Sequence, residues 1–137
     1  MPSPSGYSGT PLAKKLGFKA SGRVCVLGAP QDYVALLEPL PDGLSFETEL
    51  GVQTDLVHVF TTRREELEQL LTRLRHTLRS DAALWVSWPK KASKLSSTVT
   101  EETIRELALP LGFVDIKVCA VNEIWSGLKL VLRKELR

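Results

Sequence analysis

The chain has 137 residues, of which 43% are hydrophobic and 25% charged, which is typical of a folded protein rather than a disordered one. Lys and Arg number 18 and Asp and Glu 16, so the net charge of +2 indicates no broad basic surface, and nucleic-acid binding is not expected. No apolar run reaches the roughly 18 residues of a membrane span, and the first residues show no secretion signal. We expect a cytoplasmic protein without membrane contact.

Residues 1–9 are rich in Pro, Ser and Gly, which predicts a flexible tail. Residues 10–137 suit a single α/β domain. Cys25 and Cys119 lie in apolar runs, so we expect reduced thiols inside the core rather than a disulfide.

Helix-like and strand-like patterns alternate along the chain. In chain order they predict a helix over 10–17, a strand over 22–28, a helix over 33–40, a short strand near a sheet edge over 44–50, a strand over 55–61, a helix over 62–79, a strand over 83–88, a loop over 92–99, a helix over 100–112, and strands over 113–121 and 128–132.

Several of these elements carry signals at their ends. Thr10 followed by Pro11 is typical of an N-cap and a first helical position. Thr62 and Glu65 match a capping box before a stripe of leucines. Pro110 predicts an irregular end to the last helix.

The order of the elements predicts the fold class. Strands that alternate with helices form a mostly parallel sheet with right-handed crossovers and helices on both faces. The connection over 122–127 is too short for a crossover helix, so the last two strands must be an antiparallel hairpin. We predict an α/β three-layer sandwich with a Rossmann-like sheet that ends in a β-hairpin.

This arrangement resembles the class I methyltransferase sheet. The segment over 55–60 resembles that fold's fourth strand, 83–88 its fifth, and 113–131 its last two. The chain is short by about one strand and two helices before residue 55, so it resembles a truncated member. A flavodoxin-like sheet is the alternative.

The resemblance implies S-adenosylmethionine as cofactor, but the expected Gly-rich turn is missing. The turn over 28–32 holds one glycine, and Pro30 lacks the N–H that a ligand would need there. Glu47 or Glu49 could replace the ribose-binding acid. We therefore expect no cofactor.

A second resemblance covers almost the whole chain. The strings YSGTPLAKKLG over 7–17, LWVSWPKKAS over 84–93 and VCAVNEIWSGLK over 118–129 resemble an uncharacterised bacterial family of small domains of unknown function. Asn122 and Ile124 depart from the Asp and Thr expected in that family. The resemblance implies no activity.

Ligands of open α/β sheets bind beyond the carboxyl ends of the parallel strands, so we expect the ligand site there. The exits after residues 28, 60 and 88 should meet the hairpin loop at this edge, with the first helix across it as a flap. The predicted ligand-binding residues are Thr61, Arg63, Trp88, Lys90, Lys91, Trp125, Ser126, Gly127 and Lys14. Ammonium groups beside aromatic rings suit a phosphate or a nucleotide.

These residues also have structural interpretations. The two Trp rings could cap the core, and the lysines could belong to a solvated loop. His58 is expected to be a hydrogen-bonded core residue and His76 a solvated one. We find no catalytic set and no metal-ligand pattern.

The leading hypothesis is a non-enzymatic binding module for a small anionic ligand or an acidic segment of a protein partner. A degenerate methyltransferase-like transferase is one alternative. A homo-oligomeric scaffolding protein, such as a homodimer through the hairpin edge, is the other.

Overall fold

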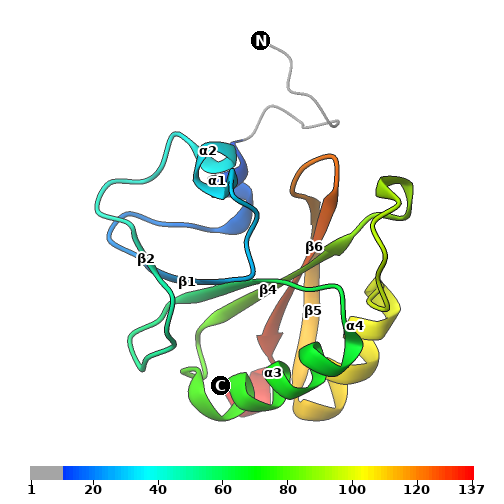
Figure 1. Ribbon diagram of the computed structural model, residues 1–137. Helices are drawn as coiled ribbons and strands as arrows, with labels where there is room; N and C mark the ends of the chain where they lie inside the picture. Colours follow the sequence, from blue (N-terminus) through cyan, green and yellow to red (C-terminus); the bar gives the residue numbers. More distant parts are fainter. Residues whose placement is uncertain (1–10) are drawn as a thin grey trace.

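The computed structural model describes residues 11–137 and contains a six-stranded sheet in the order β2-β1-β3-β4-β6-β5 (Figure 1). The elements are α1 (Leu12–Leu16), β1 (Arg23–Leu27), α2 (Tyr33–Leu37), β2 (Ser45–Glu47), β3 (Leu56–Phe60), α3 (Arg64–Thr77), β4 (Ala83–Pro89), α4 (Glu101–Ala108), β5 (Phe113–Ala120) and β6 (Trp125–Leu132). Short 3₁₀ turns over Lys91–Ser93, Leu109–Leu111 and Lys134–Leu136 complete them.

The sheet confirms the predicted fold class. β1 pairs in parallel with β2 and β3, and β3 pairs in parallel with β4. β6 then enters between β4 and β5 and is antiparallel to both. β2 is the short edge strand that the alternating pattern predicted.

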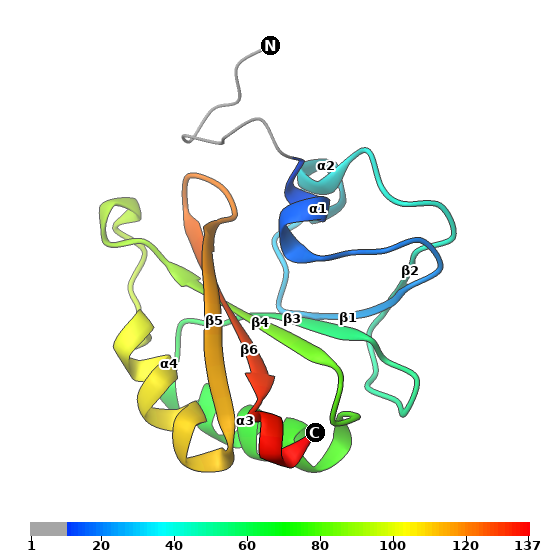
Figure 2. The ribbon, with the colours of Figure 1, turned by 180° about the vertical axis from the view of Figure 1, so that it is seen from behind.

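Helices cover the two faces of the sheet, as Figures 1 and 2 show from opposite sides. On one face α3 and α4 pack against alternate residues of the central strands, among them Val57, Leu84 and Val86. On the other face α1 and α2 pack against the residues between these, including Leu56, Phe60 and Trp85. Because both faces are covered, the central strands are mostly apolar rather than alternating, with His58 and Ser87 as the buried polar exceptions in β3 and β4.

α1 is fastened to the sheet through Trp85. The indole is fully buried and its Nε1–H donates to the carbonyl oxygen of Leu16 at 2.8 Å. Pro11 occupies the N-cap position of α1, so the expected placement of proline inside the helix is wrong by one residue. Thr10 and the predicted tail over 1–9 lie outside the described residues.

The predicted capping box at the start of α3 is wrong. The helix begins at Arg64, Arg63 is its N-cap residue, and no side chain of its own segment caps it. Instead Thr98, from the loop after β4, accepts a hydrogen bond from the Arg64 N–H at 2.8 Å. Thr62 contributes its carbonyl oxygen, which accepts from the Thr98 N–H at 2.9 Å.

α4 shows the irregular end that Pro110 predicted, because the helix passes into a 3₁₀ turn at Leu109 and closes at Gly112 with a left-handed conformation. Both cysteines are free; Cys25 is fully buried, as expected of a core thiol, whereas Cys119 is only partly buried. None of the helices within residues 11–137 is long and apolar enough to cross a membrane.

Candidate functional site at the carboxyl edge of the sheet

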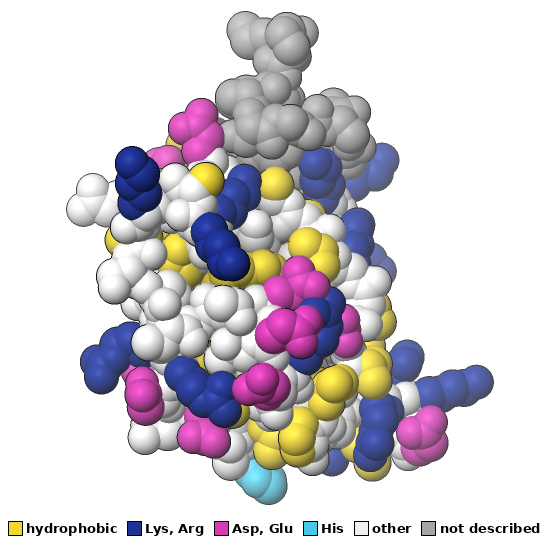
Figure 3. Space-filling view, turned by 90° about the vertical axis from the view of Figure 1, so that its right-hand side faces the viewer, with side chains coloured by type: hydrophobic (Ala, Val, Ile, Leu, Met, Phe, Trp, Pro, Cys, Tyr) yellow, Lys and Arg dark blue, Asp and Glu magenta, His cyan; other side chains and the backbone are white. Residues whose placement is uncertain are grey.

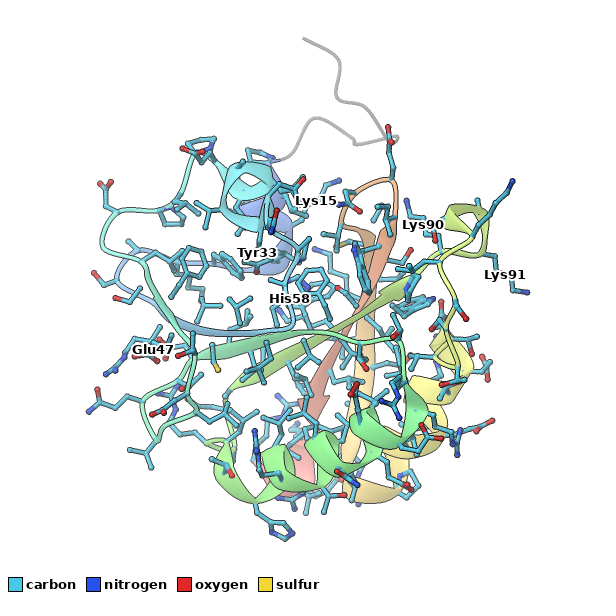
Figure 4. All side chains as sticks on the ribbon, viewed as in Figure 1. Lys15, Tyr33, Glu47, His58, Lys90 and Lys91 are labelled. Atoms are coloured by element: carbon cyan, nitrogen blue, oxygen red, sulfur yellow. The ribbon has the colours of Figure 1, made fainter. Side chains whose placement is uncertain are left out.

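The strand exits meet at the carboxyl edge of the sheet, as the topology predicted. The Thr61 N–H donates to the Ser87 carbonyl oxygen at 3.1 Å, which joins the exits of β3 and β4. The Lys90 N–H donates to the Ile124 carbonyl oxygen at 2.7 Å, which joins the β4 exit to the hairpin. This edge lies toward the right-hand side of the sheet in Figure 4, where Lys90 and Lys91 are labelled.

Lys90 holds the hairpin loop in place. Its Nζ donates to the carbonyl oxygen of Asn122 at 2.7 Å. The Asn122 side chain closes the same loop, since its Oδ1 accepts from the backbone N–H groups of Ile124 and Trp125 at 2.8 Å each. Lys90 is therefore in part a structural residue, whereas Lys91 points outward beyond it (Figure 4).

A cavity of about 500 Å³ opens beside the β4 exit, and we call it the Trp88 cavity. It lies between the β4 exit, the loop after it and the first turn of α4, and its lining includes Trp88, Lys90, Lys91, Leu95, Ser97 and Thr100. Three of the predicted ligand-binding residues thus share one concave surface, of a size suited to a small molecule.

The acidic residues of the Trp88 cavity are already engaged. Glu101 and Glu102 lie on its α4 wall, and both form ion pairs with Arg105. Within residues 11–137 neither Lys90 nor Lys91 forms an ion pair with a carboxylate. Figure 3 shows this side, with acidic and basic side chains interleaved over its middle and Lys and Arg side chains toward its upper part. Arg105 also pairs with Asp115, so one guanidinium serves three carboxylates, and Lys90 and Lys91 are the cations of this cavity that stay unpaired among the described residues.

The hairpin residues that were predicted to bind a ligand lie in the sheet. Trp125, Ser126 and Gly127 belong to β6 and pair with β4, so their placement in a loop is wrong. The connection is shorter than expected because the Asn122 side chain closes it as a tight turn. Trp125 packs edge-on against Phe60, with ring centroids 5.1 Å apart. This contact agrees with the structural interpretation in which the Trp ring caps the core.

The remaining predicted residues do not line the Trp88 cavity. Thr61 is buried, and its Oγ1 accepts from the Arg63 N–H at 3.3 Å. The Arg63 side chain is exposed and lies 3.8 Å from Glu66. Lys14 is exposed on α1, away from this cavity.

The turn after β1 contains a glycine for a structural reason. Gly28 has a φ of 73°, and a Cβ at this position would lie 2.6 Å from the Phe60 carbonyl oxygen. The close approach of β1 to β3 therefore requires glycine whether or not a cofactor binds. A cavity of about 460 Å³ does adjoin Gly28, on the α3 side, with Thr61 and Arg73 in its lining.

Aromatic side chains fill the space on the α2 side of this turn. Tyr33 is buried and packs edge-on against Phe46, His58 and Phe60, with ring centroids 5.4 to 5.9 Å apart. That side of the carboxyl edge is consequently closed to a ligand.

A buried polar chain crosses the core beneath this edge. Ser87 Oγ lies 2.7 Å from His58 Nε2, and His58 Nδ1 lies 2.8 Å from the Tyr33 hydroxyl oxygen. Burial lowers the pKa of His58 to about 3 and raises the pKa of Tyr33. A serine hydrogen-bonded to a histidine is the arrangement of a catalytic nucleophile and its base. Because His58 and Ser87 are fully buried, no substrate can reach them.

The expectation that His58 is a hydrogen-bonded core residue is confirmed. The sequence analysis missed Ser87 as its partner. A serine in an otherwise apolar strand beside a strand that carries a histidine was the available signal. Within residues 11–137 no cluster of His, Cys, Asp and Glu is arranged to hold a metal ion.

Comparison with solved structures confirms the fold. The chain superposes on mitomycin 7-O-methyltransferase with a TM-score of 0.64 at 8% identity, covering 82% of this chain and 49% of that one. It superposes on a SAM-dependent methyltransferase from Aquifex aeolicus with a TM-score of 0.62 at 13% identity, covering 89% and 88%. It superposes on Aeropyrum pernix fibrillarin, solved with bound S-adenosyl-L-methionine, with a TM-score of 0.59 at 10% identity, covering 88% of this chain and 73% of that one.

The chain spans about half the length of the mitomycin enzyme. No protein-family model and no curated protein matches the sequence, so the resemblance to an uncharacterised bacterial family stays a prediction. At these identities the likeness establishes a Rossmann-like, methyltransferase-like fold.

Proposed function

We propose that the chain is a non-catalytic binding module that takes a small anionic ligand in the Trp88 cavity. The observation that carries the proposal is the pair of ammonium groups at this cavity, since within residues 11–137 Lys90 and Lys91 have no carboxylate partner. Trp88 supplies an apolar wall against which a ring can stack.

The geometry gives each group a role. Lys90 is fixed by the Asn122 carbonyl oxygen, so one ammonium group is held at the cavity before a ligand arrives. Lys91 is exposed and free to close on an anion. The start of α4 adds the positive end of a helix dipole.

The test is a calorimetric titration with adenosine monophosphate, which combines a ring with a phosphate. Lys91→Glu should weaken binding at least tenfold, since it places a negative charge where the proposal needs a positive one. Lys134→Glu, the same change at an exposed site in the last 3₁₀ turn, is the matched control and should bind like the wild type.

Equal affinity in Lys91→Glu and the wild type would refute the proposal. Lys90→Glu is a poorer probe, because it also removes the hydrogen bond that holds the hairpin loop.

A degenerate transferase is the second candidate, and the cavity beside Gly28 in a methyltransferase-like fold favours it. A saturable heat of binding with S-adenosylmethionine that Lys91→Glu leaves unchanged would support it. The possible homodimer stays a prediction, which light scattering at high protein concentration would check.

A further inference from the structure

Two lysines face each other on the side of the sheet that α1 covers. Lys117 on β5 and Lys129 on β6 are directly opposite in the antiparallel ladder. Directly opposed residues point to the same face, and like charges in this position repel and destabilise the sheet. Partial burial lowers the pKa of Lys129, and the charges of Lys117 and Lys19 lower it further. Lys19 comes from the segment between α1 and β1.

Nothing in the described part of the chain neutralises these three lysines. Within residues 11–137 none of them forms an ion pair. Lys117 Nζ donates to the Lys15 carbonyl oxygen at 3.3 Å, near the end of α1. Lys129 Nζ lies 3.5 Å from the position that a Cβ on Gly17 would take, so it reaches the same helix end. Positive charge therefore accumulates at one place.

A cavity of about 520 Å³ adjoins this place, and we call it the lysine cavity. Its lining includes Lys19 and Lys129 together with the apolar side chains of Phe18, Leu56 and Val131. The segment between α1 and β1 forms one wall, and Figure 2 shows it (blue) curving away from α1 before it returns as β1.

The lysine cavity is separate from the Trp88 cavity. It lies at the amino ends of β1, β3 and β4, opposite to the edge where the Trp88 cavity opens. Asp55 and Asp81 also belong to its lining, and both are paired with Arg79, at 2.8 and 3.0 Å. Four cations, Lys19, Arg23, Arg79 and Lys129, line the cavity against these two acids, so its charge stays positive.

We propose that the lysine cavity binds the phosphate monoester of a small organic molecule. The phosphate lies against Lys129 with Lys19 closing on it, Lys117 adds its positive charge from outside the lining, and the organic part lies against Phe18 and its apolar neighbours. A phosphate monoester carries a charge near −2 at neutral pH, which matches a group of lysines better than a carboxylate does. The anion also relieves the repulsion across the β5–β6 pair.

The experiment is a thermal-shift and calorimetric titration with phenyl phosphate at pH 8. Benzenesulfonate, a monoanion with the same ring, and inorganic phosphate are the comparison ligands. The variants are Lys129→Met and Lys117→Met, with Lys91→Met to remove binding at the Trp88 cavity and Lys134→Met as the control outside both. Circular dichroism checks that each variant is folded.

The two lysine substitutions in the β5–β6 pair should weaken ligand binding but raise thermal stability. Lys129→Met and Lys117→Met should bind phenyl phosphate at least tenfold more weakly, and both should melt at a higher temperature than the wild type without ligand, because the repulsion is gone. Lys134→Met should bind like the wild type, Lys91→Met should retain the binding that Lys129→Met removes, and benzenesulfonate should bind at least tenfold more weakly than phenyl phosphate.

Two results would overturn the proposal. One is the absence of saturable binding of phenyl phosphate by the wild type. The other is a loss of binding in Lys91→Met but not in Lys129→Met, which would assign the phosphate to the Trp88 cavity. The two proposed sites can therefore fail independently.

Discussion

At the scale of single residues, the most constrained group is the fully buried imidazole of His58. It bridges the Tyr33 hydroxyl and the Ser87 hydroxyl, so one side chain connects α2, β3 and β4. Each ring nitrogen has a partner, and within residues 11–137 no buried side-chain polar atom is left without one. The neutral imidazole is thus stable in the core, whereas a charged one is not.

This burial predicts a pH dependence of stability. The pKa of His58 is about 3 in the folded protein, below its ordinary value of 6.5. As the pH falls below 6.5, the unfolded chain takes up a proton that the folded protein does not. The free energy of unfolding should therefore be at its maximum above pH 6.5 and fall by up to about 1.4 kcal/mol for each pH unit below it.

Urea unfolding between pH 7.5 and 5 measures this effect before the carboxylates titrate. His76→Gln, which removes the exposed histidine of α3, should retain the slope. His58→Gln should lower stability at pH 7.5 and flatten the slope. The same slope in His58→Gln as in the wild type would show that another group titrates.

For single residues, the sequence alone could predict which side chains are buried but not which ones are hydrogen-bonded to each other. His58 lies in an apolar strand, so a core position followed from its neighbours. Its partners are 25 and 29 residues away, and only the register of β3 against β4 and the position of α2 bring them together. For the same reason Lys90 was expected to bind a ligand, although it also holds the hairpin.

At the scale of elements, α3 depends on a loop far along the chain. Thr98 provides the acceptor at the helix start through its Oγ1. A local capping box was expected because Thr62 and Glu65 have the right spacing, but the chain at Thr62 turns instead toward the loop after β4. Local patterns predicted where the helix lies, and tertiary contacts decided how it begins.

Removal of this acceptor should be measurable. Thr98→Ala should reduce the free energy of unfolding by about 1 kcal/mol, the usual cost of a lost cap. Thr98→Ser keeps the hydroxyl and should lose much less. If Thr98→Ala is as stable as Thr98→Ser in chemical denaturation, the interaction across the loop does not stabilise α3.

At the scale of the whole molecule, the alternation of strands and helices was enough to predict the sheet. Parallel strands need crossovers, and the short connection before β6 permits only a hairpin, so the class followed from element order. Element order did not predict the position of β6 between β4 and β5. The cavities were beyond prediction, since their walls come from segments as distant as Phe18 and Val131.

The central place of β6 predicts a strict dependence of the sheet on its last strand. Without β6 the edges of β4 and β5 have no partner, because the two strands are not adjacent. A chain that stops before Trp125 should lack the cooperative unfolding transition of the complete domain. Circular dichroism during urea titration would show this, and a normal transition would contradict it.

The same strand has a consequence for synthesis on the ribosome. Proteins emerge from their amino end, and here the strand that joins the two parts of the sheet is the last to emerge. Until then β4 presents an apolar edge with unpaired backbone groups, of the kind that recruits other chains. The complete sheet therefore cannot form until residue 132 has left the ribosome.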